Sequence, residues 1–484
     1  MKQALLLSSF LAFSTALHAQ VPIIDYGFLV EDPSVLVNNV LVQPDGKILV
    51  GGVFFNYGGS GHDHLVRLHS DGTIDATFNP GGVGPGNAVE DMVLMPDGRI
   101  LIAGNFLTYN GSNTFFIARL FADGTLDPTF NVQPGSINGA VWAIELHDNH
   151  KVIAGGEFFI CSGQSSPHIA RFNDNGSLDT TFMVGTGFDH NVHELLVLPD
   201  LRIVVGGQFT QYNGTPSGHI ALLSPQGPID PTMDNDPGLS STGGIVRALA
   251  RQPDGKILVG GYFQYHNGQP RSAVERLNLD GTHDAAFTSP LYMYALVRAV
   301  AVQADGKLLV GGEFTSSEYA NAVPGPARLV RLHTDGSRDN SFAIGSGIGP
   351  GSQTTSYVHT IAVQPDSKIL VGGYFETVDT ETQYPQIVRL LDGNINGSEE
   401  LDNASTLSVL LEPSTGNLFL QTTFGGTDDA LLQLHGLNGQ LVHSERVRMG
   451  SGALIPLQLG LRSGLYLVSL TQGDQRVAAK VVVE

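Results

Sequence analysis

The chain has 484 residues, of which 15% are charged and 60 are glycine, a composition typical of turn-rich β-proteins rather than helical ones. A formal net charge of −21 argues against nucleic-acid binding, which needs a basic face, and permits cation binding. The single cysteine, Cys161, excludes an internal disulfide and is expected to be a small buried residue.

The first residues read as a targeting signal. Lys2 precedes the apolar run ALLLSSFLAFSTAL, and small residues follow it. Such a segment is typical of a secretory signal peptide and is too short to span a membrane. We place the signal peptide at residues 1–19, with cleavage after Ala16 or Ala19. No later stretch is apolar and long enough to be a transmembrane segment. The sequence therefore predicts Sec-type export to the periplasm, followed by secretion or display on the outer-membrane cell surface.

One phrase recurs in seven units along the following residues. It reads VQPDGKILVGG from Val42, RQPDGKILVGG from Arg251 and VQPDSKILVGG from Val363. The units are spaced about fifty residues apart, which is the size of a propeller blade. Each unit is predicted to hold four short strands, with Asp-Gly turns joining the first to the second and the third to the fourth. Seven such units predict an all-β, seven-bladed β-propeller.

The repeats also predict pairing within each blade. A two-residue turn at Asp45-Gly46 would place Val37 opposite Phe54, and the same Val–Phe pair would recur in all seven units. On the third and fourth strands, Arg67 and Asp75 would lie nearly opposite each other as an ion pair. The fourth unit departs from this pattern, with Leu222 above Asp230. A second apolar column ends the fourth strands at Phe78, Phe130, Phe182, Met233, Phe287 and Phe342.

The seventh unit lacks this last element. Its sequence runs through IVRLLDGNING without a DxxF motif, whereas the N-terminal IIDYGF contains Asp25 and Phe28. We therefore expect the N-terminal strand to close the ring, with Asp25 beside Arg389 and Phe28 packed in the last blade. A ring closed by both chain ends limits exposed strand edges.

These residues resemble the bacterial delta-60 repeat family, whose signature runs like QPDGKILVGG…ARL..DG..D.TF. The resemblance covers residues 21–397, with local departures at LPDLRIVVGG in unit four and LHDNHKVIAGG in unit three. It implies a β-propeller in an extracellular setting and no established reaction.

The C-terminal part has a different pattern. After a linker at residues 398–404, alternating apolar residues and turns at residues 414–416 and Asn438-Gly439 predict a small antiparallel β-sandwich over residues 405–484. The segments LNGQLV and SGLYLVSL and the strand-forming end with Lys480 resemble the C-terminal sorting domain of the type IX secretion system. The usual Pro-Asn-Pro start is reduced to Pro413. The resemblance implies the type IX secretion machinery as a partner.

Catalytic and metal-binding motifs are not found in the sequence. It contains no GxSxG, HExxH or phosphate-loop motif. The pairs His147–His150 and His190–His193 do not converge in the repeat register, and His62 and His64 lack a third ligand. We predict no metal site and no cofactor. Calcium at the Asp-rich turns, such as Asn173 to Asp179, is kept as an alternative to plain turn chemistry.

A ring of varied residues follows the Val column and suggests a ligand site. If the first strand is innermost, these residues and their cross-strand partners would surround one mouth of the central channel. Aromatic, Arg and Glu side chains suit sugar or peptide groups. The full ring reads Asn38, Glu90, Trp142, His193, Arg247, Arg298 and His359, with partners Val53, Asn105, Glu157, Gln208, Tyr262, Glu313 and Tyr374. The candidate ligand-binding residues are Trp142, Glu157, His193, Arg247, Tyr262, Arg298, Glu313, His359 and Tyr374.

Three functions are compatible with this reading. The first is an exported monomeric propeller that binds a glycan, peptide or protein without catalysis. The second is a polysaccharide hydrolase or lyase at the same rim, with Glu90, Glu157, Glu313 and the two histidines as its acids and bases. The third is a structural or adhesive repeat protein, for which a solvated rim tolerates any residue.

Overall fold

The computed structural model describes most of residues 35–392, three residues before them, and seven strands after them. None of the helices within this described part has the length and apolarity needed to span a bilayer. The expected signal peptide, residues 1–19, and linker, residues 398–404, lie outside the described residues. The described residues are 24, 25, 28, 35–133, 137–148, 150–161, 163–233, 238–241, 243–317, 325–342, 344–349, 355–378, 381–382, 386–392, 407–412, 417–422, 429–436, 441–448, 454–457, 464–472 and 475–483.

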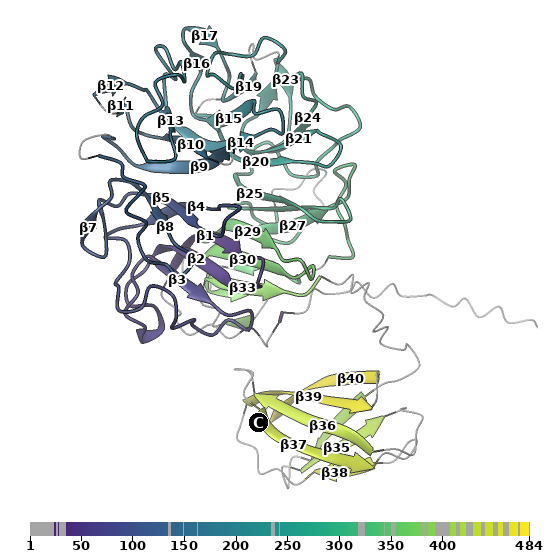
Figure 1. Cartoon of the computed structure of the whole chain (residues 1–484). Helices are drawn as coiled ribbons and strands as arrows, with labels where there is room; N and C mark the ends of the chain where they lie inside the picture. Colours follow the sequence, from purple (N-terminus) through teal and green to yellow (C-terminus); the bar gives the residue numbers. More distant parts are fainter. Residues whose placement is uncertain are drawn as a thin grey trace, which may run out of the picture.

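The first unit of the structure is a ring of seven antiparallel sheets, each with three strands (Figure 1). Each inner strand lies against the inner strands of both neighbouring sheets, and β29 of the last sheet lies against β1 of the first. The expected seven-bladed propeller is therefore confirmed.

Each blade has an inner, a middle and a third strand. In blade order, these strands are β1 (Leu36–Val42), β2 (Ile48–Val53) and β3 (Leu65–Leu68); β4 (Val89–Leu94), β5 (Ile100–Gly104) and β8 (Ile117–Leu120); β9 (Val141–His147), β10 (Lys151–Gly156) and β13 (Ile169–Phe172); β14 (Val192–Val197), β15 (Ile203–Gly207) and β18 (Ile220–Leu223); β20 (Ile245–Arg251), β21 (Ile257–Tyr262) and β24 (Val274–Leu277); β25 (Val297–Val302), β26 (Leu308–Gly312) and β27 (Leu329–Leu332); β29 (Tyr357–Val363), β30 (Ile369–Tyr374) and β33 (Ile387–Leu390).

Short elements occur in the loops between the middle and third strands, and two of them, β19 (Leu239–Ser240) and β28 (Ile348–Gly349), precede the inner strands of blades five and seven. In most blades they form two-residue ladders, and blade one instead has the 3₁₀ turn η1 (Tyr57–Gly59). The ladder strands are β6 (Thr108–Tyr109), β7 (Ser112–Asn113), β11 (Ile160–Cys161), β12 (Gln164–Ser165), β16 (Gln211–Tyr212), β17 (Thr215–Pro216), β19 (Leu239–Ser240), β22 (Tyr265–His266), β23 (Gln269–Pro270), β28 (Ile348–Gly349), β31 (Thr377–Val378) and β32 (Glu381–Thr382).

The expected fourth strand is reduced to a single bridge in each blade. In blade one, Leu68 bridges Ile74, after which the chain turns. The turn is closed by the Phe78 N–H, which donates to the Asp75 carbonyl at 3.1 Å, while the Asp75 carboxylate accepts the Thr77 N–H at 3.0 Å. Because Asp75 ends the ladder with its own side chain, no longer strand can form there.

The predicted Val–Phe register is wrong, although both columns are buried. The first hairpin has a three-residue loop, in which the Gln43 N–H donates to Lys47 O at 2.8 Å and Gly46 has φ +83°. This is a type I turn followed by a left-handed residue, a common alternative to the two-residue turn. A β-bulge after Val37 then shifts the pairing once more, so that Val37 lies opposite Gly52 rather than Phe54.

The paired glycines of the repeated phrase make this arrangement possible. A Cβ on Gly52 would lie 1.9 Å from the Leu36 carbonyl oxygen, so the bulge leaves no room for a side chain there. The glycine before it serves the contact between blades: a Cβ on Gly51 would lie 2.8 Å from Cγ1 of Val89, on the next inner strand. The same contact joins Gly372 to Val37 across the closure, at 2.6 Å. The phrase is therefore architectural.

A second repeated contact ties each blade to the next at its outer side. In blade one, Arg67 Nε donates to Asp75 Oδ2 at 2.8 Å, and its guanidinium lies 4.7 Å from the centre of the Phe78 ring. Its Nη1 donates to the Ala122 carbonyl in the turn of blade two. Burial opposes ionisation of Asp75, but hydrogen bonds from Thr77 and the charge of Arg67 hold its pKa well below the usual range. The same Arg–Asp pair recurs at Arg119–Asp127, Arg171–Asp179, Arg276–Asp284, Arg331–Asp339 and Arg389–Asp25.

The basic residue of the phrase supports the same carboxylate. Lys256 Nζ donates to Asp284 Oδ2 at 2.7 Å, and this hydrogen bond is the main reason that the pKa of Asp284 falls to about 2. In blade four, where Leu222 replaces the arginine, Arg202 from the position of this lysine pairs with Asp230 at 3.4 Å. The exception therefore keeps a cation beside the aspartate.

The N-terminal segment closes the ring, as the sequence predicted. Ile24 bridges Leu390, and the Asp25 N–H donates to the Arg389 carbonyl at 2.8 Å. Arg389 Nε donates to Asp25 Oδ2 at 2.9 Å, and the guanidinium lies 4.6 Å from the centre of the Phe28 ring. Its Nη1 donates to the Ser70 carbonyl of blade one. The last blade thus makes the same contacts as the others, with one partner taken from the far end of the chain.

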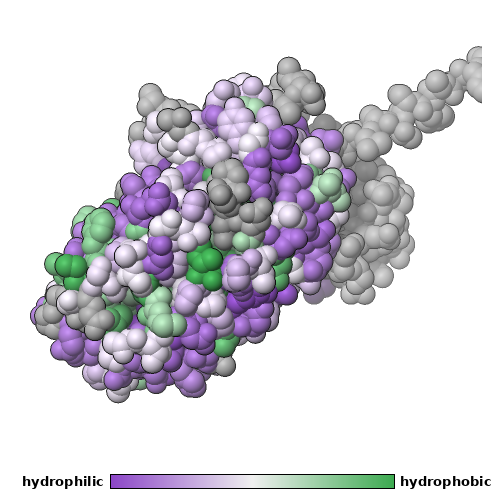
Figure 2. All heavy atoms as spheres, turned by 90° about the horizontal axis from the view of Figure 1, so that it is seen from above, coloured by the Kyte–Doolittle hydropathy of each residue, from purple (hydrophilic) through white to green (hydrophobic). Residues whose placement is uncertain are grey.

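The outer surface reflects this packing. On the face seen in Figure 2, the described residues are mostly hydrophilic and apolar ones form small separate patches. Apolar side chains instead fill the spaces between blades, as in the cluster of Phe54, Val37, Leu68 and Leu370.

The C-terminal unit contains two antiparallel sheets. The three-stranded sheet has the order β34 (Leu407–Glu412), β35 (Asn417–Thr422) and β38 (Leu454–Leu457), and the four-stranded sheet has the order β37 (Leu441–Arg448), β36 (Asp429–Gly436), β39 (Gly464–Gln472) and β40 (Gln475–Val483). Strand β34 lies against β40. Buried Leu432 and Leu434 lie opposite buried Leu470 and Val468. This arrangement is the small β-sandwich expected from the sequence.

The second glycine of the phrase can be tested by substitution. Gly261→Ala should destabilise the propeller by about 3 kcal/mol, the upper part of the range for overpacking, because its Cβ would lie 2.0 Å from the Ile245 carbonyl oxygen. Gly268→Ala is the control, since that position has open space and only a positive φ, and should cost about 1 kcal/mol. Urea denaturation compares the two, and equal losses would contradict the bulge argument.

Closure by the N-terminal segment gives a second prediction. Truncating a buried phenylalanine to alanine costs about 3–5 kcal/mol, so Phe28→Ala should lower the thermal midpoint as much as Phe78→Ala does. Phe55→Ala, at a site that is 70% exposed, should change it little. If Phe28→Ala melted like Phe55→Ala, the closing segment would not hold the ring.

Candidate functional site

The bulge of each inner strand aims one side chain at the centre of the ring. In all seven blades the pairing register skips the residue after the buried valine, as between Val246 and Ala248. A bulged residue has no partner in the ladder, and bulges commonly re-aim side chains beside functional sites. The seven bulge residues are Asn38, Glu90, Trp142, His193, Arg247, Arg298 and His359.

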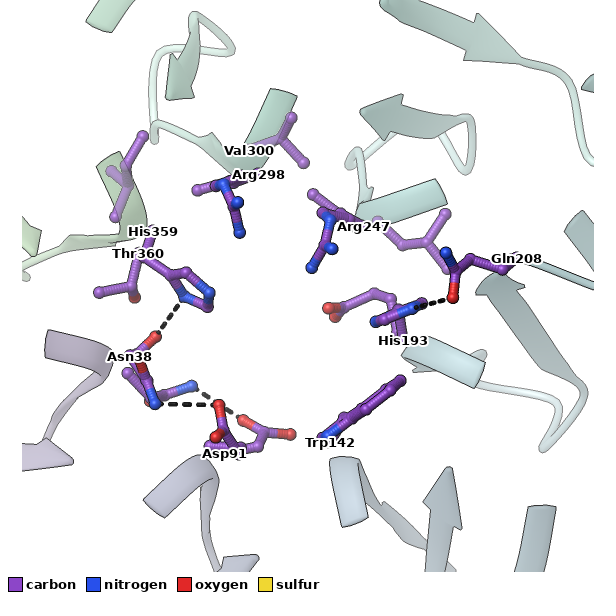
Figure 3. Close-up of a pocket in the computed structure, with 17 residues that line it drawn as sticks. Asn38, Asp91, Trp142, His193, Gln208, Arg247, Arg298, Val300, His359 and Thr360 are labelled. Carbon is purple, nitrogen blue, oxygen red and sulfur yellow. Dashed lines mark hydrogen bonds between the residues drawn. The ribbon is translucent and has the colours of Figure 1, made fainter. Parts of the chain in front are cut away.

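These residues converge on one cavity. It has a volume of about 430 Å³, in the lower part of the range for small-molecule sites, and all seven bulge residues line it (Figure 3). In every blade but the third, the next residue lines it too, as Asn39 and Asp91 do. A bulge places two residues opposite one, so two neighbouring side chains can face the same cavity. The innermost strands thus form a single mixed polar and aromatic site.

One side of the cavity is aromatic. The rings of Trp142 and His193 are stacked, with centroids 4.4 Å apart and planes at 16°. His193 Nε2 lies 3.2 Å from Gln208 Oε1, which fixes its orientation. Burial, reinforced by the nearby charge of Arg247, lowers the pKa of His193 to about 3. The imidazole is therefore neutral at physiological pH and extends the indole as a flat wall.

Another side is basic. Arg247 and Arg298, from neighbouring blades, both point into the cavity (Figure 3). Arg298 Nε donates to Glu313 Oε1 at 2.7 Å, and its guanidinium lies 4.4 Å from the centre of the Tyr357 ring. Burial and then the charge of Arg298 lower the pKa of Arg247 to about 10, so it remains a cation at neutral pH. Two cations facing one space suit an anionic group.

Amides and carboxylates from blades one and two form a polar side. Asn38 Nδ2 donates to Glu90 Oε2 at 2.9 Å, and Asn39 Nδ2 donates to Asp91 Oδ1 at 2.8 Å. Across the closure, His359 Nδ1 donates to the Asn38 carbonyl at 2.9 Å. Burial lowers the pKa of His359 to about 4, so this ring is neutral as well. The polar side offers donors and acceptors suited to hydroxyl groups.

Three carboxyl groups lie close together on the inner strands of blades two to four. Burial raises the pKa of Asp91 to about 6 and that of Glu145 to about 8, and raises that of Glu194 well above its usual range. Repulsion among the three groups adds to the effect. Asp91 still accepts the Ile144 N–H at 2.8 Å. Glu145 is therefore mostly protonated near neutral pH, and the shift of Glu194 has the same direction.

The residues proposed from the sequence divide into two groups. Trp142, His193, Arg247, Arg298 and His359 line the cavity, whereas Glu157, Tyr262, Glu313 and Tyr374 do not. Of the second group, Glu313 orients Arg298, and the ring of Tyr374 lies 5.8 Å from that of Tyr357. The four were chosen as direct partners of the bulge residues, but the bulge removes that pairing.

Several cavity residues were missed. Asn39, Asp91, Glu194 and Thr360 each follow a bulge residue and line the cavity. Strict alternation along a strand would turn them to the other face. The sequence did contain a signal for them: these four residues are polar although strict alternation would place them on the face opposite the bulge residue, away from the cavity.

The histidine and aspartate patterns are held by other contacts. His62 Nε2 lies 3.1 Å from the Phe78 carbonyl, and His64 Nδ1 lies 3.2 Å from the Gly52 carbonyl. In the turn considered for calcium, Asn175 Oδ1 accepts the Ser177 N–H at 3.0 Å and Asp179 is paired with Arg171. Across the described ranges, no three His, Cys, Asp or Glu side chains are grouped in a way that could hold a metal ion.

Solved structures resemble the chain only weakly. The extracellular domain of a candidate one-component system from B. thetaiotaomicron is 11% identical, with coverage of 93% of this chain and 68% of that one and a TM-score of 0.22. A candidate gluconolactonase is 15% identical, with coverage of 65% and 93% and a TM-score of 0.34. A protein of unknown function from Bacteroides thetaiotaomicron is 13% identical, with coverage of 94% and 100% and a TM-score of 0.30. At these values the likenesses carry no functional argument. No curated protein matches the chain.

A family model matches once in each blade. Its description is "Domain of unknown function (DUF5122) beta-propeller", a delta-60-type repeat family, and it matches residues 43–78, 96–130, 150–182, 198–232, 252–287, 303–342 and 364–391. Each segment contains the glycine that lies opposite the bulge, and those of blades one, two, three, five and six also contain the Arg–Asp pair of their blade. The chain belongs to this family of repeat β-propellers.

Proposed function

We propose that the protein is an exported, non-catalytic binding propeller that takes a small glycan or peptide group into its central cavity. The observation that carries the proposal is the convergence of seven non-identical bulge residues on one cavity of about 430 Å³. The repeats keep the buried valine and the glycines but vary the bulge residue. A site with a flat aromatic wall, a basic side and a polar side has the chemistry of a small-molecule site.

A catalytic role is a second candidate. Carboxyl groups with raised pKa values in a cavity are typical of acid–base sites; Glu194 fits this description, and Glu145, with a pKa of about 8, acts on its charge from the neighbouring blade. They would supply a general acid for a polysaccharide hydrolase or lyase. We favour binding because Glu194 lines the cavity whereas Glu145 is not among its lining residues.

For export, we propose that residues 1–19 direct the chain to the periplasm and that the C-terminal sandwich, residues 405–484, directs it through the type IX secretion system. The support is the resemblance of LNGQLV and SGLYLVSL to sorting-domain sequences. Both segments belong to the part of the chain outside the propeller repeats. The mature protein would then be secreted or displayed at the cell surface.

The binding proposal predicts the effect of removing the aromatic wall. Arrays of glycans and peptides, screened with the purified chain, identify the ligand, and analysis of the recovered ligand for cleavage separates binding from catalysis. Trp142→Ala should then weaken binding by about 1–3 kcal/mol, as for other stacked contacts. Phe159→Ala, at an exposed site outside the cavity, should leave affinity unchanged. Equal affinity of the wild type and Trp142→Ala for the ligand would show that the cavity is not the binding site.

The sorting proposal predicts a change of location. Deleting residues 405–484 should trap the propeller in the periplasm, because the sorting element is lost while the signal peptide remains. Cell fractionation with an antibody to the propeller measures this. The full-length Trp142→Ala variant serves as the control and should be exported normally. Unchanged surface or culture-medium levels of the truncated chain would refute the proposal.

A further inference from the structure

We infer that the ligand of the central cavity is an acidic saccharide, whose carboxylate is bound by Arg247 and Arg298 while its sugar ring lies against the Trp142–His193 wall. The inference rests on the proposed binding function and adds the chemical class of the ligand. It depends on four features: the unpaired state of Arg247, the fixed position of Arg298, the charges around them, and the surfaces on the other sides of the cavity.

Arg247 forms no direct ion pair within the described part of the chain. Its Nε is buried and makes no hydrogen bond, and none of the described ion pairs includes its guanidinium. An unsatisfied buried donor on a charged group is costly, since burial strips its water without supplying an acceptor. The other arginines facing aspartates in the propeller, such as Arg67 and Arg119, each have a carboxylate within 2.8 Å. Arg247 therefore has donors available for a bound anion.

Arg298 lies beside Arg247 in a fixed orientation. Glu313 accepts its Nε and Nη2, and the Tyr357 ring lies beneath its guanidinium at 4.4 Å. These contacts fix the plane of the guanidinium before any ligand binds, which lowers the entropic cost of binding. Glu313 is 39% exposed, so it does not fill the cavity. The inner edge of Arg298 stays directed toward Arg247 (Figure 3).

The carboxyl groups across the cavity do not neutralise this pair fully. Burial raises the pKa of Glu145 to about 8 and raises that of Glu194 in the same direction, which favours their uncharged forms. Glu313 and, to a smaller extent, Glu90 act on the charge of Arg247, but Glu313 is bonded to Arg298 and Glu90 to Asn38 of blade one. Arg247, whose Nε has no acceptor, can bind a carboxylate through paired N–H donors, and Arg298, whose Nε and Nη2 are taken by Glu313, adds a second guanidinium beside it.

The remaining surfaces favour a sugar over a peptide as the carrier of that carboxylate. Trp142 and His193 present parallel flat rings, which suit the C–H face of a pyranose. Asn38, Asn39 and Gln208 supply amide donors and acceptors for its hydroxyl groups. The apolar lining residues are Ala248, Leu249, Ala299, Val300 and Ile361, whereas the other twelve of the 17 are polar, charged or aromatic, which favours a sugar over a peptide with apolar side chains.

The experiment measures binding of the full mature chain to four probes by isothermal titration calorimetry. The probes are a trigalacturonate, its methyl ester, the corresponding neutral trigalactose and an acidic tripeptide. Wild type should bind the acid at least about thirtyfold more tightly than the ester, which corresponds to a lost contact of about 2 kcal/mol with a buried charge. Arg247→Met should reduce affinity for the acid by a similar factor and leave the ester unchanged.

Two controls keep the result interpretable. Arg446→Met, at an exposed site in the C-terminal sandwich, should bind like wild type. Arg247→Lys should restore part of the affinity, because it retains a charge without the paired donors. The thermal midpoint of each variant checks that the propeller is folded.

The outcomes separate this inference from the proposed function. Equal affinity for acid, ester and neutral sugar, all weakened by Trp142→Ala, would overturn carboxylate recognition and leave the binding function standing. Binding of the acidic peptide alone would overturn the saccharide class. Absence of binding to any probe, in an otherwise folded chain, would overturn the inference, and failure of the broader array screen would overturn the proposed function.

Discussion

The clash that a side chain would cause at the second glycine of each repeat is the constraint on which the rest of the structure depends. At Gly52 and Gly261 a Cβ would fall on a backbone carbonyl of the inner strand. Only glycine lets the two strands approach there, and that approach is what holds the bulge. The bulge in turn removes one residue per blade from the ladder and directs it inward. The cavity therefore exists because a short, repeated backbone feature is enforced seven times around one axis.

A second contact makes the seven blades one ring. In six blades, all but the fourth, an arginine is bound to an aspartate of its own blade, stacked on an aromatic ring and hydrogen-bonded to the next blade, as Arg67 is. Buried ion pairs add little net stability by themselves, because desolvation offsets attraction. Their role here is to position the blades, because one guanidinium donates hydrogen bonds to two blades at once. Arg389 does this with Asp25, so the N-terminal segment is held by the same contacts as five other interfaces between blades.

The division between scaffold and site follows from these two contacts. Buried valine, glycine and arginine positions are fixed by packing, whereas a bulge residue meets only the cavity and can vary. The variation is not evenly spread: the rings lie in blades three and four, the cations in blades five and six, and the amides and acids in blades one and two. Removing these groups from bulk water lowers the pKa values of His193 and His359 and raises those of Glu145 and Glu194. The result is a cavity in which the guanidinium groups of Arg247 and Arg298 form one side and carboxyl groups of Glu90 and Asp91 another.

By itself, the sequence determined the repeat number, the propeller, its closure by Asp25 and Phe28, and the position of the varied ring next to the valine column, because these depend on local patterns and on a missing motif. It did not determine the register. The Asp-Gly and Gly-Gly sequences are compatible both with a two-residue turn in a regular hairpin and with the observed three-residue loop and bulge. Which of the two forms is decided by the packing of the strands and of the neighbouring blades. The placement of Glu157, Tyr262 and Tyr374 outside the cavity, the inward turn of Asn39 and Asp91, and the unpaired state of Arg247 were decided by the tertiary structure, since each depends on which side chains of different blades meet at the axis.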